Sequence, residues 1–465
     1  MKNNNFIDLI NNLKAEYIFL VLGAIFGIMI AFSNPPFHSN DEDRHYYLAY
    51  YYSTGRVSPD TLNKLPGLLI PQNLYNIVSS TQGINYFAGD KISRAKIEED
   101  KKIKLEKDKK IFMSLVTYIN PIAYIPATIG IFIGNFINDN PISLLYAGRI
   151  ANLIFFLIVV FFAIKLVPIF KTTFTMIALS PMVIYQASSV TYDTPILALS
   201  LFIVAYIIKL YYQVEQINDK QLIYLLLITF IIHIIKQGYL FIPLLAIILP
   251  QEKFVKKNYY WGIIILLVVI YFLATQIWNI YVSSLNLPPF PKFLSDFKYG
   301  GDESINIILS NPLEFIYKIL MNFITQGKEW LWGAFGRFGY SYTIMNKLIL
   351  FIYGFVLISV AFLDKGNYKE FDLKTKIKIL AVAILGILSI VVGFFVTSTP
   401  IGANLVFGIQ GRYFIPFISI LLLALYNNTF HFELFTRYKY IFVLIFMFII
   451  LTFTVIFINK ELWKA

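Results

Sequence analysis

The segment SNPPFHSNDEDRHYY, which begins at Ser33, carries the residues best suited to chemistry. Two prolines end the apolar helix before it, and a polar residue next to Asp41 can cap a new helix. Asp41 and His45 are four positions apart, so they would share one helix face. Asp41 or Glu42 can act as a general base toward a hydroxyl, or help to hold a divalent cation such as Mg or Mn. Alternatively, these acids only complement the helix dipole.

Four more ionisable residues lie in or beside apolar segments, namely Arg149, Asp193, Lys236 and Arg412. A charged side chain in a membrane costs about 2.5–3.5 kcal/mol on insertion scales, so each one needs a reason. Arg149 can pair with an internal acid or bind a phosphate oxygen. Asp193 can cap a helix, or face Asp41 as a second acid that orients an acceptor or shares a metal. Lys236 and Arg412 can anchor at the interface or bind phosphate.

The composition places these residues in a membrane protein. Of the 465 residues, 58% are hydrophobic and 14% are charged, and the mean hydropathy is +0.66. A soluble enzyme is excluded, and continuous apolar runs argue against a β-barrel. The chain has no cysteine, so thiolate chemistry is excluded. Most of the net charge of +12 lies in short loops, which suits an anionic lipid surface and argues against a nucleic-acid partner.

The apolar runs predict an all-α polytopic membrane protein with about eleven transmembrane helices, because a span needs roughly 20 residues. The predicted spans are residues 17–33, 143–167, 171–188, 194–212, 221–236, 238–250, 258–284, 346–363, 376–397, 411–427 and 438–459. An additional stretch, 118–137, is predicted to dip into the outer face without crossing. With the N-terminus cytoplasmic, this arrangement puts the lysine-rich short loops inside, as the positive-inside rule requires.

Residues 1–465 are expected to form one integral membrane domain with two long outer segments. The first, 34–142, holds the acidic motif and an interfacial or re-entrant helix. The second, 285–345, includes an amphipathic helix that starts at Pro312. In this topology Asp41, Arg149, Asp193, Lys236 and Arg412 all fall on the outer side, which predicts one outward-facing site.

Several motifs give the chain a resemblance to a bacterial membrane-protein family, catalogued as domain-of-unknown-function family 2142. The matching elements are Pro35-Pro36-Phe37 with Asp41-Glu42 and His45, Gly148-Arg149-Ile150-Ala151-Asn152, Ser180-Pro181-Met182 with Asp193, and Gly408-Ile409-Gln410-Gly411-Arg412-Tyr413-Phe414-Ile415-Pro416. The chain departs from the family pattern at Asp43 and Arg44, where Pro and Ala are usual, and at Arg337, where Trp is usual.

That family in turn is similar to the GT-C glycosyltransferases, which are polytopic, carry an acidic motif in the first outer loop and use sugars linked to polyprenyl phosphate. The resemblance implies transfer of a sugar from such a donor to a cell-envelope polysaccharide or lipid-linked glycan acceptor, at the outer face of a bacterial plasma membrane. The implied catalytic residues are Asp41, Glu42 and Asp193, with Asp41 and Asp193 as metal ligands if a divalent cation takes part. The implied substrate-binding residues are His45, Arg149, Lys236, Gln410, Arg412 and Tyr413.

Two rival functions remain at this point. A transporter or flippase of lipid-linked glycans could use the same charges to hold a pyrophosphate, although the sequence shows no internal repeat. A non-catalytic envelope-assembly protein is the other alternative, and it would tolerate substitution of the acids.

Overall fold

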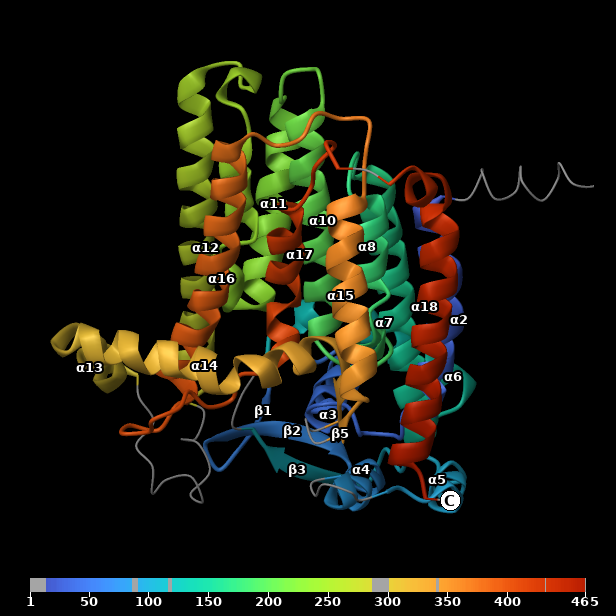
Figure 1. Cartoon of the computed structure of the whole chain (residues 1–465). Helices are drawn as coiled ribbons and strands as arrows, with labels where there is room; N and C mark the ends of the chain where they lie inside the picture. Colours follow the sequence, from blue (N-terminus) through green and yellow to red (C-terminus); the bar gives the residue numbers. More distant parts are fainter. Residues whose placement is uncertain are drawn as a thin grey trace, which may run out of the picture.

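The computed structural model describes residues 14–85, 91–115, 119–286, 301–339, 343–430 and 432–464. These residues are mostly helical, which confirms the prediction of a helical membrane protein (Figure 1). In the described part, six helices are long and apolar enough to cross a membrane. They are α2 (Ala15–Ser33), α7 (Pro141–Leu166), α10 (Asp193–Tyr212), α12 (Lys257–Ser284), α16 (Leu373–Ser398) and α18 (Glu433–Leu462).

The prediction of about eleven spans is not confirmed, because the remaining apolar segments are shorter or broken. The predicted span 171–188 divides at Pro181 into α8 (Lys171–Ala178) and α9 (Pro181–Ala187). Proline also stands at the first turn of two other short elements, where it cannot continue a preceding helix. The short elements of the bundle are α11 (Asp219–Ile235), η2 (Gln237–Tyr239), η3 (Pro243–Ile248), η4 (Gln251–Lys253), α15 (Lys347–Leu363), η6 (Gly411–Phe414) and α17 (Ile415–Leu423).

A bent helix pair, α13 (Asp302–Ser310) and α14 (Pro312–Gly336), would be a seventh span if counted as one. The two helices meet at 106°, and α14 runs across the bundle instead of along it (Figure 1). The Asn311 side chain accepts a hydrogen bond from the Glu314 backbone N–H at 3.4 Å, which caps α14. Exposed apolar side chains follow along the helix, as in an interfacial helix. Residues 287–300 and 340–342 of the predicted second outer segment lie outside the described residues.

Most of the strands and short helices that do not run parallel to the bundle lie at one end of the bundle. We call this end the α3 end. Its elements are α3 (Glu42–Ser53), β1 (Asp60–Leu62), β2 (Leu65–Pro71), α4 (Gln72–Asn85), α5 (Arg94–Asp100), β3 (Lys110–Ser114), β4 (Arg337–Phe338) and β5 (Thr343–Ile344). The first three strands form an antiparallel sheet in the order β1-β2-β3, which the sequence did not predict. Within the charged stretch 91–110, only α5 is helical.

The stretch 118–137 becomes η1 (Pro121–Tyr124) and α6 (Ile125–Ile137) at the α3 end, and residues 116–118 are not described. With 13 residues, α6 is about 20 Å long, whereas a hydrocarbon core measures about 30 Å. The helix therefore cannot cross a membrane alone. It lies against the first turns of α7, where Gly130 and Gly134 face Ala147 closely.

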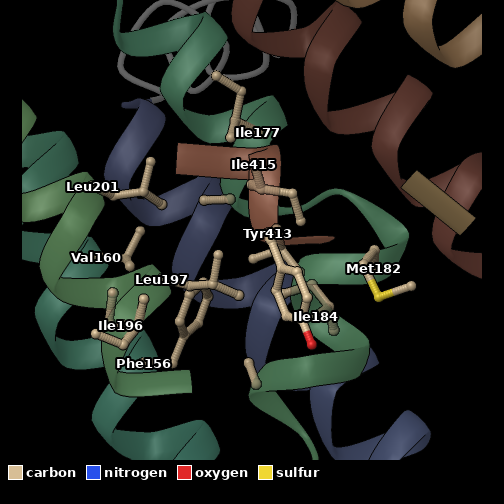
Figure 2. Close-up of a cluster of buried hydrophobic side chains, with 14 of the residues drawn as sticks. Phe156, Val160, Ile177, Met182, Ile184, Ile196, Leu197, Leu201, Tyr413 and Ile415 are labelled. Carbon is tan, nitrogen blue, oxygen red and sulfur yellow. The ribbon is translucent and has the colours of Figure 1, made fainter. Parts of the chain in front are cut away.

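The core beneath the α3 end is built from side chains of several bundle helices (Figure 2). Phe156 of α7, Ile184 of α9, Leu197 of α10 and Ile415 of α17 are all buried there. Tyr413 of η6 belongs to the same cluster, so the segment that carries Arg412 rests on a packed apolar layer (Figure 2).

The contact between η6 and α14 depends on a glycine. A Cβ atom built on Gly411 would lie 1.9 Å from the Trp330 carbonyl oxygen and 2.5 Å from the Ala334 nitrogen. Both atoms belong to the backbone, so neither can move aside like a flexible side chain. Gly411 therefore permits the close approach that places Arg412 beside α14.

We predict that Gly411→Ala lowers the unfolding free energy by about 1–3 kcal/mol, because α14 must move away from η6. Thermal unfolding of the purified protein, followed by tryptophan fluorescence, measures this effect. Gly262→Ala is the matched control, since a Cβ atom there meets nothing within 4 Å. Equal melting temperatures for the two variants would contradict the close contact.

Candidate functional site

The sequence-predicted residues Glu42 and Arg149 form a buried ion pair. The Arg149 Nε donates to Glu42 Oε1 at 2.8 Å, and a terminal nitrogen lies 2.5 Å from Oε2. Both side chains are 0% exposed. The remaining guanidinium hydrogens go to three backbone carbonyls, that of Ala31 in the last turn of α2 and those of Asn34 and Pro35 in the α2–α3 connection.

Glu42 also accepts a hydrogen bond from the Val190 backbone N–H at 3.0 Å. Every donor of Arg149 is thus in use, and Glu42 is closed off from any ligand. We therefore assign this pair a structural role: it fastens the α2–α3 connection to α7 and to the segment before α10.

Asp41, one residue earlier, is in a different situation. Its backbone is left-handed, with φ at 55°, and its side chain does not cap α3. Among the described residues, its half-buried carboxylate makes no hydrogen bond or ion pair. Asp41 stands at the N-terminus of α3, so the alternative that it complements the helix dipole stays open. Left-handed backbone is costly for most residues and recurs at functional sites, and Asp and Asn tolerate it best.

A second buried cluster joins Asp193 to two cations. Asp193 Oδ1 accepts from Lys236 Nζ at 2.8 Å, and Oδ2 accepts from Arg412 Nε at 2.7 Å. The side chains of Asp193 and Arg412 are 7% and 6% exposed, and that of Lys236 is 18% exposed. Two cations therefore share one directly bonded carboxylate in a poorly solvated site.

Tyrosine rings surround the Lys236 ammonium group. The Lys236 ammonium lies 4.2 Å from the Tyr413 ring centroid, 4.8 Å from that of Tyr192 and 5.4 Å from that of Tyr239. The Tyr239 hydroxyl donates to the Tyr413 carbonyl at 3.1 Å, which ties η2 to η6. Such ring faces favour a desolvated cation and hold it in place.

Gln410 and His45 complete the cluster. The Gln410 side-chain oxygen accepts a hydrogen bond from the Arg412 guanidinium. His45 Nδ1 is hydrogen-bonded to the Tyr124 hydroxyl at 2.6 Å, and its ring packs edge-on against Tyr192. Burial lowers the pKa of His45 to about 4, although Asp41 and Asp193 act in the opposite direction. His45 is therefore neutral at pH 7 and adds no charge to the site.

Two cavities adjoin the cluster, one at each cation. Lys236 and Tyr413 line a cavity of about 360 Å³ whose other walls are mostly apolar and include Phe394 of α16. Arg412 and Gln410 line a smaller cavity of about 200 Å³ against α14, where Glu329 forms an ion pair with Arg337. The charged cluster thus stands between an apolar space and a polar one.

The geometry does not suit the divalent cation that the sequence left open. Both Asp193 oxygens already contact cationic nitrogens. Among the residues that the structure describes, no group of three or more His, Asp or Glu side chains is placed to hold a metal ion. We therefore derive no step that passes through a metal.

The structure brings together Asp41, His45, Asp193, Lys236 and Arg412 and separates them from the Glu42–Arg149 pair. Asp41 and Asp193 both act electrostatically on His45, Tyr124 and Tyr192. Sequence reasoning missed Tyr124, Tyr192 and Tyr239, which lie between the charges. Tyr192 precedes Asp193 directly, but in a chain with 32 tyrosines no local signal singles these residues out.

The bundle and its charged cluster define a multi-pass helical membrane protein with a buried ionic site at the α3 end. The chain belongs to the family described as predicted membrane protein, DUF2142, which it matches over residues 24–421. All residues of the site lie inside this range. No curated protein and no solved structure matches the chain.

We predict that Arg149→Met lowers the unfolding free energy by about 3–5 kcal/mol, because it leaves the Glu42 charge buried without a partner. The double substitution Glu42→Gln with Arg149→Met should recover part of this loss. Melting temperatures of the three proteins in the same detergent provide the measurement. An unchanged melting temperature for Arg149→Met would rule out the structural role.

Proposed function

We propose that this protein is a GT-C-like glycosyltransferase that uses a sugar linked to polyprenyl phosphate. The observation that carries the proposal is that Lys236 and Arg412 converge on one carboxylate, that of Asp193, while in the described part of the chain the nearby carboxylate of Asp41 makes no hydrogen bond or ion pair. A phosphate leaving group needs a cationic site, and an acceptor hydroxyl needs a base. Lys236 and Arg412 offer the cationic site and Asp41 the base, whereas Glu42–Arg149 offers neither.

In the proposed reaction, Asp41 takes the proton of an acceptor hydroxyl as its oxygen attacks the anomeric carbon of the donor sugar. The bond from that carbon to the phosphate oxygen breaks, and its electron pair stays on the polyprenyl phosphate. The configuration at the anomeric carbon inverts. The leaving phosphate gains one negative charge, which Lys236 and Arg412 stabilise.

The remaining residues have positioning roles in this proposal. Asp193 holds both cations toward the same point and does not act as a base, because its oxygens are occupied. Gln410 and Tyr413 fix the Arg412 side chain, and neutral His45 with Tyr124 shapes the wall near Asp41. The apolar cavity beside Lys236 can accommodate the first part of a lipid chain.

We infer that the α3 end faces outward in a bacterial plasma membrane. The opposite end of the bundle holds lysines in short connections, as the positive-inside rule expects for a cytoplasmic face. There, Lys171 donates to the Ile164 carbonyl and Lys439 to the Asp364 carboxylate. In this orientation the acceptor is a glycan outside the cell or a lipid-linked glycan of the outer leaflet.

We predict that Asp41→Asn reduces sugar transfer by about 10²–10⁴-fold without lowering the melting temperature. Asn keeps the size and tolerates left-handed backbone, so only the basicity is lost. The measurement is transfer of radiolabelled sugar from polyprenyl-phosphate monosaccharides in membranes that contain the protein. Glu42→Gln is the matched control, and its activity should fall only together with its melting temperature. Wild-type rates for Asp41→Asn would refute Asp41 as the base.

Arg412→Lys tests the phosphate site separately. It keeps the positive charge but loses the planar fork that reaches both Asp193 and a ligand oxygen. We expect the affinity for the donor to fall about tenfold while the protein stays folded. Donor titration of the transfer rate gives this value, and an unchanged half-saturating concentration would mean that Arg412 does not contact the donor.

A further inference from the structure

A separate cavity of about 590 Å³ lies at the α3 end and shares no lining residue with the charged cluster. It is open on one side and lined by the C-terminal end of α3, by strand β2, by the segment that enters β3, and by α6. Neither the proposed base nor the proposed phosphate site uses it. Its two sides differ in chemistry.

One side of this cavity is apolar and continues onto the surface of α6. Ile129 and Phe132 line the cavity and are 52% and 51% exposed. Phe136 and Ile137, at the end of the same helix, are 76% and 82% exposed. Because α6 is too short to cross a membrane, its exposed apolar face suits the acyl region of one leaflet and its ends suit the headgroup region.

The other side is basic. Arg56 contacts Asp60 at 3.2 Å, and Lys107 lies 3.8 Å from Asp139. Lys110 also lines the cavity and has no ion-pair partner among the described residues. Of the described residues, three cations and no acid line the cavity itself, although Asp60 and Asp139 contact two of these cations.

A polar acceptor lies between the two sides. The Asn135 side-chain oxygen is buried and has no hydrogen-bond partner in the described part of the chain. It can accept a hydrogen bond from a ligand hydroxyl.

We propose that this cavity binds the headgroup of an anionic phospholipid from the adjacent leaflet. The phosphate lies against Lys107, Lys110 and Arg56, and the acyl chains follow Ile129 and Phe132. A headgroup hydroxyl, as in phosphatidylglycerol, can donate to Asn135. This site is independent of the proposed sugar transfer, since it shares no residue with that site.

The test compares Lys107→Gln/Lys110→Gln with Lys102→Gln/Lys104→Gln. Both pairs remove two lysines from the same segment, but only the first pair lines the cavity. Purified proteins in neutral detergent are titrated with phosphatidylglycerol and with phosphatidylcholine, and bound lipid is counted by native mass spectrometry. We expect phosphatidylglycerol to bind preferentially, and the cavity variant to lose about 30-fold in affinity, since each lysine near a lipid surface contributes about 1 kcal/mol.

The control pair should bind phosphatidylglycerol like the unmodified protein. Equal binding of the two lipids, or an equal loss in both variants, would overturn the proposal. Inorganic phosphate forms a third arm. Full competition by millimolar phosphate would mean that the cavity recognises a free phosphate group, and this too would overturn the lipid assignment. Phe132→Ala should weaken lipid binding and leave melting temperature unchanged, because the side chain is half exposed.

Discussion

The buried ion pair between Glu42 and Arg149 is the interaction on which the α3 end depends. A guanidinium group that is buried away from water needs a hydrogen-bond acceptor for each of its N–H groups. Here one carboxylate and three backbone carbonyls are the acceptors. The pair thereby fixes the turn from α2 into α3 and the start of that helix. Asp41 is the residue immediately before α3, so its position and its left-handed backbone follow from this constraint.

The two buried ionic groups differ in how their charges are paired. This difference is why we assign a structural role to the first group and propose a ligand for the second. Glu42 and Arg149 cancel each other and leave no donor free. Asp193 is shared by Lys236 and Arg412, so two cations meet one directly bonded carboxylate, and three tyrosine rings face the Lys236 ammonium. Two cations that share one carboxylate can still bind a ligand of opposite sign, and this is the basis for the proposal that the site binds a phosphate.

Much of the site could be predicted from the sequence, because charges in apolar segments are few and conspicuous. The grouping of Asp193, Lys236 and Arg412 on one side followed from the distribution of lysines in the loops. The breaks at Pro181 and in the short 3₁₀ segments reduced the number of long spans, since each proline ends a helix that hydrophobicity alone would extend. The small sheet was missed because its strands are short and one of them, Leu65–Pro71, carries two prolines and a glycine.

The sequence by itself determined that this chain enters a membrane and that its buried charges must be paired, because apolar content and desolvation cost are properties of composition. Only the tertiary structure decided which acid meets which cation. Glu42 and Arg149 are 107 residues apart, and Asp193 and Arg412 are 219 apart, so no local pattern relates them. Helix packing brings Glu42 to one cation and Asp193 to two. Whether a charge is cancelled or left available depends on that geometry and not on the residue types.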